Sequence, residues 1–324
     1  MRVAPEAQSA ERDEQHLARL VRGRLTELIG PDSVPPASAL RHPAFHSLAH
    51  AAQRAARRGD VNAGVRGRFT AETAAAATRV VATAFTEKVH DLWQVGLPGP
   101  ERHLTASVRR AAAQVAAVPG RTTTADEVVI GAWNDDRRAA LRASCRLLGA
   151  AWPEMLAELA VVLRQIALLD GHGLEGFTDF TVHGVVFVNS ERLEDAQDGL
   201  PGSVRFAEAL VHEGTHNRCN AAAVAEPFLL PDSGASPLVQ TPLRADPRPL
   251  SGLFQQVIVL ARSMEFYDRA LRAGANGDAV RERRAVLAEQ GRKGVVTMRA
   301  HADSITVHGH SMVEEAAALL ERSA

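Results

Sequence analysis

Two histidines and a glutamate stand together in the stretch ALVHEGTHN, where His212, Glu213 and His216 form an HExxH pattern. In an α-helix, positions i and i+4 project from the same face one turn apart. Two imidazoles placed in this way can bind one metal ion, with the intervening glutamate beside it. The spacing therefore predicts a metal site in which His212 and His216 are ligands and Glu213 is a catalytic residue.

The same five letters serve two chemistries, and the third ligand separates them. The metzincin pattern HExxHxxGxxH is excluded, because Cys219 and Ala222 stand where its glycine and last histidine belong. A zinc hydrolase or peptidase that takes a glutamate from a later helix could use Glu265, and a C-terminal histidine is a further alternative. In a hydrolase, Glu213 is the general base; in an iron oxygenase, it orients ligands or contacts substrate.

A proline- and arginine-rich segment follows the HExxH pattern. Within residues 242–249, the sequence PLRADPRP matches a PWRxDPRP signature, with Leu243 in place of the tryptophan. Together with GVVFVNS and ALVHEGTHN, this segment resembles the HExxH-motif family of peptide-modification proteins. The resemblance implies a non-haem Fe(II)- and 2-oxoglutarate-dependent dioxygenase, a hydroxylase of bacterial natural-product biosynthesis. Its substrate would be a peptide or an amino-acid derivative, either a ribosomal precursor peptide or a carrier-bound one.

The resemblance also implies further site residues. Where some members carry a third metal-binding histidine, this chain has Gln255, or Gln256, whose amide oxygen can bind Fe(II) or Zn(II). An arginine should pair with the distal carboxylate of 2-oxoglutarate through two parallel hydrogen bonds, and we expect Arg248 first and Arg244 second. If the ligand set is degraded, the protein is instead a non-catalytic binding protein.

Composition excludes several other classes of function. The 324 residues carry a net charge of −1, so no global field recruits nucleic acid or an anionic membrane. The apolar stretches are too short or too often interrupted by charge to span a bilayer, and the charged N-terminus does not resemble a signal peptide. The two cysteines, Cys145 and Cys219, form no CxxC, which favours a cytoplasmic protein. The oligomeric state stays open.

Periodicity predicts a mainly α fold built around the HExxH helix, with one or two short strands before it. We expect helices over residues 11–29, about three helices over 45–117, a helical pair from 137, a buried helix over 156–169 and the motif helix over 204–225. A long helix over about 253–273 and two more should close the chain. Residues 182–190 predict the strands, and the prolines of 227–249 an ordered loop or lid.

Two further expectations concern organisation. We divide the chain into an N-terminal helical region, 1–170, and a metal-site region, 171–324, packed together as one globular unit. His42, His46 and His50 follow one another at intervals of four, and we expect a solvated or core-edge row of histidines there.

Overall fold

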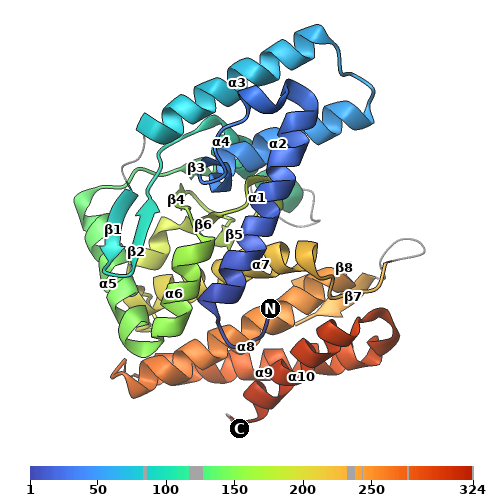
Figure 1. Ribbon diagram of the computed structural model, residues 1–324. Coiled ribbons are helices and arrows are strands. Elements are labelled where there is room, and N and C mark those ends of the chain that lie inside the picture. The colour runs from blue at the N-terminus through green and yellow to red at the C-terminus, as the bar shows by residue number, and fades with distance from the viewer. Residues whose placement is uncertain (83–85, 117–126, 232–237, 243, 276, 323–324) are drawn as a thin grey trace. The chain divides into compact units, whose positions relative to one another are not determined.

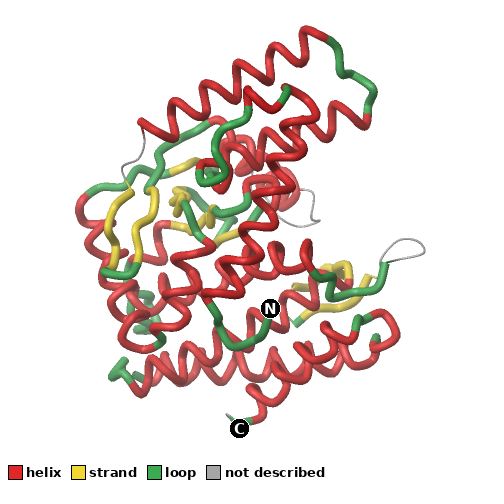
Figure 2. Tube along the Cα trace, viewed as in Figure 1, coloured by secondary structure: helices red, strands yellow, loops and turns green. Residues whose placement is uncertain are grey.

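The computed structural model describes residues 1–82, 86–116, 127–231, 238–242, 244–275 and 277–322. This part of the chain is mainly helical, as predicted, and contains ten α-helices with a small mixed sheet and a separate hairpin (Figures 1 and 2). No helix among the described residues is long and apolar enough to cross a membrane. The chain forms two compact units that are discontinuous in sequence. The division between 1–170 and 171–324 stays a prediction.

The first unit contains residues 1–10, 139–159 and 192–324. Its main helices are α7 (Gly202–Ala225), α8 (Leu250–Arg272), α9 (Asp278–Ala300) and α10 (Val307–Glu321). Helices α8, α9 and α10 pack against one another (Figure 1). Two glycines on α9 allow this close packing, because a Cβ at Gly294 would lie 2.8 Å from the side chain of Val257, and one at Gly291 2.6 Å from that of Leu320.

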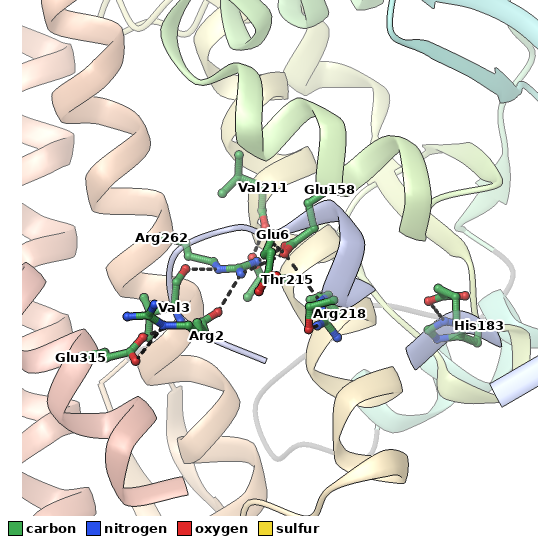
Figure 3. A network of polar contacts seen from close by, with 12 residues as sticks. Arg2, Val3, Glu6, Glu158, His183, Val211, Thr215, Arg218, Arg262 and Glu315 are labelled. Carbon is green, nitrogen blue, oxygen red and sulfur yellow. Dashed lines mark hydrogen bonds and ion pairs between the residues drawn. The ribbon is translucent and has the colours of Figure 1, made fainter. Parts of the chain in front are cut away.

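Buried charges tie the three segments of the first unit together (Figure 3). Arg262 of α8 is fully buried, and its Nη1 lies 2.6 Å from Oε1 of Glu158 in α6 (Pro153–Val162). Its Nε donates to the carbonyl of Val3 at 2.8 Å. Arg218 of α7 lies 3.6 Å from the same carboxylate and donates to Ser9 Oγ at 3.0 Å. Because an unpaired buried charge is costly, each segment stabilises the others.

The second unit contains residues 11–138 and 160–191 and holds a mixed sheet with the strand order β1-β2-β4-β6-β5. The strands are β1 (Thr86–His90), β2 (Trp93–Gly96), β3 (Val129–Ile130), β4 (Gln165–Asp170), β5 (Gly176–Phe177) and β6 (Val185–Asn189). Central strands β4 and β6 are parallel, with Ile166 opposite Val186, and β3 pairs with β4. Both central strands are buried almost throughout, which explains their continuous apolar sequences.

Besides α6, other helices precede or separate these strands in the sequence. They are α1 (Ala7–Ile29), α2 (Pro43–Arg57), α3 (Ala63–Ala82), α4 (Arg102–Ala116) and α5 (Asp135–Ala151), with α1 and α5 beginning or ending in the other unit. His46 of α2 is only 2% exposed, so the row of histidines there is not solvated as a whole. The ring of His46 lies 5.3 Å from that of His183, whose Nε2 is 2.7 Å from Oε1 of Glu14. The second unit therefore has polar groups in its core.

Several elements differ from those predicted. The expected helix over 156–169 is wrong in its second half, because α6 ends at Val162 and β4 follows. Strands β1 and β2 interrupt the region expected to hold only helices, although α2, α3 and α4 are present there. The predicted strand within 182–190 is confirmed as β6, and the predicted motif helix and the three helices after it are confirmed as α7 to α10.

The proline-rich segment includes an antiparallel hairpin, made of β7 (Leu238–Thr241) and β8 (Arg244–Pro249). The DPRP sequence therefore lies in an extended strand, which is compatible with proline because the pair has only two strands and so no central strand. Val239 pairs with Arg248, and Thr241 pairs with Arg244. Leu243 lies outside the described residues.

Candidate metal site

Helix α7 positions the HExxH residues. Its first amide, Gly202 N, is capped by the side chain of Asp195 at 2.8 Å, an arrangement that also suits the helix dipole. A Cβ at Gly202 would collide with the carbonyl of Leu193, so only glycine allows this close approach at the start of the helix. Most residues of α7 are buried, including Glu213 at 7% exposure, whereas His212 and His216 are half-buried.

The two imidazoles lie one turn apart on α7, as predicted. Their ring centroids are 5.3 Å apart, with an angle of 62° between the ring planes. Burial lowers the pKa of His212 to about 4; Glu213 acts against this effect, and the charges of His216, Arg192 and Arg283 add to it. His212 is therefore neutral near pH 7, the form in which imidazole binds a metal.

Gln255 of α8 contacts His216 directly. Its Oε1 lies 2.8 Å from His216 Nδ1, and its Nε2 donates to Asn220 Oδ1 at 2.9 Å. In this arrangement the amide oxygen of Gln255 faces His216, so Nδ1 of His216 is the donor and Nε2 keeps the lone pair. The sequence placed Gln255 at the metal as a ligand; in this geometry, its oxygen is engaged by His216. Gln255 as a direct ligand stays a prediction.

The other predicted ligands have partners of their own. Glu265 Oε1 accepts a hydrogen bond from Arg269 Nε at 2.6 Å on the same helix. Near the C-terminus, His310 Nε2 lies 3.0 Å from the carbonyl of Ala302, and His308 stacks on Phe228 at 5.5 Å. Among the residues that the structure describes, no group of three or more His, Cys, Asp or Glu side chains is arranged to hold a metal ion.

Cys219 lies one turn beyond His216 on α7 and is fully buried. Burial raises the pKa of its thiol to about 12. Since the thiolate is the form that binds metals, Cys219 acts here as a small apolar side chain in the buried face of α7.

The two predicted arginines both belong to strand β8. Arg248 is half-buried and stands opposite Val239 in the hairpin. The backbone of Arg244 pairs with Thr241, but its side chain lies outside the described residues. The carboxylate-binding role of both arginines stays a prediction.

One buried cluster next to the motif was missed by the sequence reasoning. Glu208 stands four residues before His212, and its carboxylate accepts hydrogen bonds from Tyr267 of α8 and Arg283 of α9. The spacing i, i+4, i+8 of Glu208, His212 and His216 was a usable signal, because it puts all three on one stripe of the helix. Nothing in the local sequence of Arg283 or Tyr267 indicated that either residue would reach this stripe.

No model of a protein family and no curated protein matches this chain. Two imidazoles lie side by side on α7, and Gln255 of α8 contacts one of them. The side chain of Glu213, which stands between them in the sequence, is buried. Imidazole binds Fe(II) and Zn(II) alike, so the two histidines can supply part of the ligand set of either metal.

Proposed function

We propose that the protein is an Fe(II)- and 2-oxoglutarate-dependent oxygenase that hydroxylates a peptide or an amino-acid derivative. The observation that carries this proposal is the pair His212 and His216, with His216 held through Nδ1 by Gln255. Metal-binding histidines in proteins usually donate their second ring N–H to an oxygen in this manner, which fixes the tautomer and the ring orientation. The resemblance of the segment PLRADPRP to the peptide-modification family supports iron over zinc.

In this proposal, the imidazoles of His212 and His216 hold the metal, the latter through Nε2. When bound, Fe(II) with 2-oxoglutarate would supply the oxidising power that a hydroxylation requires. The protein's own residues would orient the bound groups and keep water out of the site. Buried Glu213 holds its neighbours or the substrate in place, and an arginine pairs with the carboxylate of the keto acid, Arg248 or Arg244 being the residues that the family signature favours.

The experiment that tests the proposal is an anaerobic titration of the protein with Fe(II) and 2-oxoglutarate. We expect a visible charge-transfer band that needs both components, and we expect its loss in His212→Ala and His216→Ala. A protein that shows no band, binds Zn(II) tightly and cleaves peptides would be a hydrolase instead. Binding of neither metal, even after reconstitution, would indicate a non-catalytic binding protein.

Glu213 separates the two enzyme classes further. In a zinc hydrolase, the variant Glu213→Gln removes the general base and should abolish nearly all turnover. In an oxygenase, no such base is needed, so we expect Glu213→Gln to keep a measurable part of its 2-oxoglutarate turnover to succinate. Loss of more than about 10³-fold with unchanged metal content would contradict the oxygenase.

A further inference from the structure

A second polar cluster continues the stripe of metal-site residues along α7. Glu208 is four residues before His212, which is itself four residues before His216, so their side chains leave the helix on one face. The side chain of Glu208 is only 3% exposed. A carboxylate so deeply buried has to be paired, because its desolvation is otherwise costly.

Tyr267 and Arg283 pair with Glu208. The hydroxyl of Tyr267 donates to Oε2 at 2.7 Å, while Arg283 donates from Nη2 to Oε1 at 2.6 Å and from Nε to Oε2 at 3.3 Å. These contacts use one edge of the guanidinium. Since a guanidinium has five N–H donors in a rigid plane, the edge that carries Nη1 keeps donors for another acceptor. The side chain of Arg283 is 35% exposed, so that acceptor can come from solution.

The charge of Arg283 reaches the metal-site histidines. Glu208 precedes His212 by one turn on the same face of α7, and Arg283 donates to the Glu208 carboxylate at 2.6 Å, so the guanidinium lies next to the turn that carries His212. Burial lowers the pKa of Arg283, but its ion pair with Glu208 outweighs this and raises the pKa, so the guanidinium stays charged throughout the physiological range. A fixed positive charge beside a metal ligand favours an anion there.

We propose that Arg283 binds the carboxylate of a small acid or an acidic substrate beside His212, with Glu208 and Tyr267 fixing the plane of its guanidinium. The inference rests on the proposed function for the metal and deepens it, since it assigns the carboxylate to α9 instead of strand β8. Arginine suits the task because its planar fork matches a carboxylate in two parallel hydrogen bonds. A pair with the buried Glu208 orients that fork before the ligand arrives, which lowers the entropic cost of binding.

The test is a calorimetric titration of the Zn(II)-loaded protein with 2-oxoglutarate and, separately, with N-acetylglutamate. We expect Arg283→Gln to weaken binding of the preferred acid by about 10- to 100-fold, the loss typical of a hydrogen bond to a charged group. The matched control is Arg281→Gln on the same helix. Arg281 pairs with exposed Asp278 at 2.7 Å, so its substitution should leave the affinity for the acid unchanged. Which acid binds more tightly distinguishes a keto-acid cosubstrate from an acidic substrate.

Removing Arg283 leaves Glu208 buried beside Tyr267 alone, so folding needs its own control. The double variant Glu208→Gln, Arg283→Gln removes both charges, and should fold as judged by circular dichroism while it still binds the acid poorly. Unchanged affinity in either folded variant, with a loss in Arg248→Gln, would overturn the inference and assign the carboxylate to Arg248. A wild-type protein that binds neither acid would also overturn it.

Metal affinity is measured on the same samples. If the wild type binds no metal, but Arg283→Gln binds the acid more weakly than the wild type does, the proposed carboxylate site is supported and the proposed oxygenase function is contradicted. If the wild type binds metal and the Arg283 variants bind acid normally, only the inference fails.

Discussion

A single amide decides how His216 can face a metal ion. Gln255 accepts from Nδ1 at 2.8 Å and is held in turn by Asn220. In the variant Gln255→Leu, the ring is free to rotate and to change tautomer, so we expect metal affinity to fall by about 10- to 100-fold. The measurement is a competition titration with Co(II) or Zn(II) against a chromophoric chelator.

The neighbouring residue provides a control for this prediction. Gln256 has the same side chain on the next position of α8, and its Oε1 is buried without a hydrogen bond among the described residues. We expect Gln256→Leu to leave metal affinity unchanged, and Gln255→Glu to preserve it, because a carboxylate accepts from Nδ1 at least as well. Equal losses in Gln255→Leu and Gln256→Leu would assign the effect to helix packing.

At the scale of elements, helix α2 makes the second unit sensitive to acid. Burial lowers the pKa of His42 to about 4, and holds that of His46 well below its usual value with help from His183, His50 and Arg41. The unfolded imidazoles titrate near 6.5, so between pH 6.5 and 4 the unfolded chain binds more protons than the folded one. Folding stability should therefore be full above pH 6.5 and fall as the pH is lowered through this window.

Substitution of His46 tests the contribution of one imidazole. We expect His46→Leu to reduce the slope of unfolding free energy against pH by about 1 kcal/mol per pH unit, close to the value for one linked proton. Urea titrations at pH 5, 6 and 7 measure this slope. The side chain of His172 is 90% exposed, so His172→Leu should leave the slope unchanged; a slope equally unchanged in His46→Leu would contradict the prediction.

The helices were predictable where a polar face or a punctuating residue marked them, as in α7, α8 and the helices after them. Strand β4 was not, because its sequence QIALLD resumes the apolar residues of α6 after only Leu163 and Arg164, with no glycine or proline between them. A buried parallel strand and a buried helix both appear as continuous apolar residues, so periodicity cannot separate them. The pairing of β4 with β2, β3 and β6 selects the strand, and the sequence of residues 156–169 does not record it.

The residues of the candidate site also differ in whether a local sequence pattern could predict them. His212 and His216 were predictable because a local spacing within one helix brings them together. The resemblance predicted Gln255 as a metal ligand near these histidines, whereas in the structure its amide oxygen contacts His216 Nδ1. Arg283 was missed because its position beside Glu208 depends on how α9 packs against the rest of the first unit, which no local pattern records.

At the scale of the whole chain, Arg262 joins segments that are far apart in sequence. It is fully buried and binds both Glu158 and the backbone of residues 2 and 3. We expect Arg262→Met to lower the free energy of unfolding by about 3 kcal/mol, because the Glu158 carboxylate keeps only the hydrogen bond from the Glu6 amide and the longer contact to Arg218. Urea denaturation measures the change.

An exposed ion pair in the same unit is the control. Arg299 lies 2.5 Å from Glu314, but both side chains are about half exposed. We expect Arg299→Met to cost less than about 1 kcal/mol. A similar cost for both variants would mean that the buried network contributes no more than a surface pair.

The bond from Arg262 to Val3 has a consequence for synthesis on the ribosome. It closes a loop between residues 259 positions apart, so the first segment emerges long before its partners exist. At roughly 5–20 residues per second, the N-terminal residues wait on the order of ten seconds to a minute for α8. Residues 2 and 3 therefore stay without Arg262 while most of the chain is made, and we expect chaperones to act on this protein during that interval.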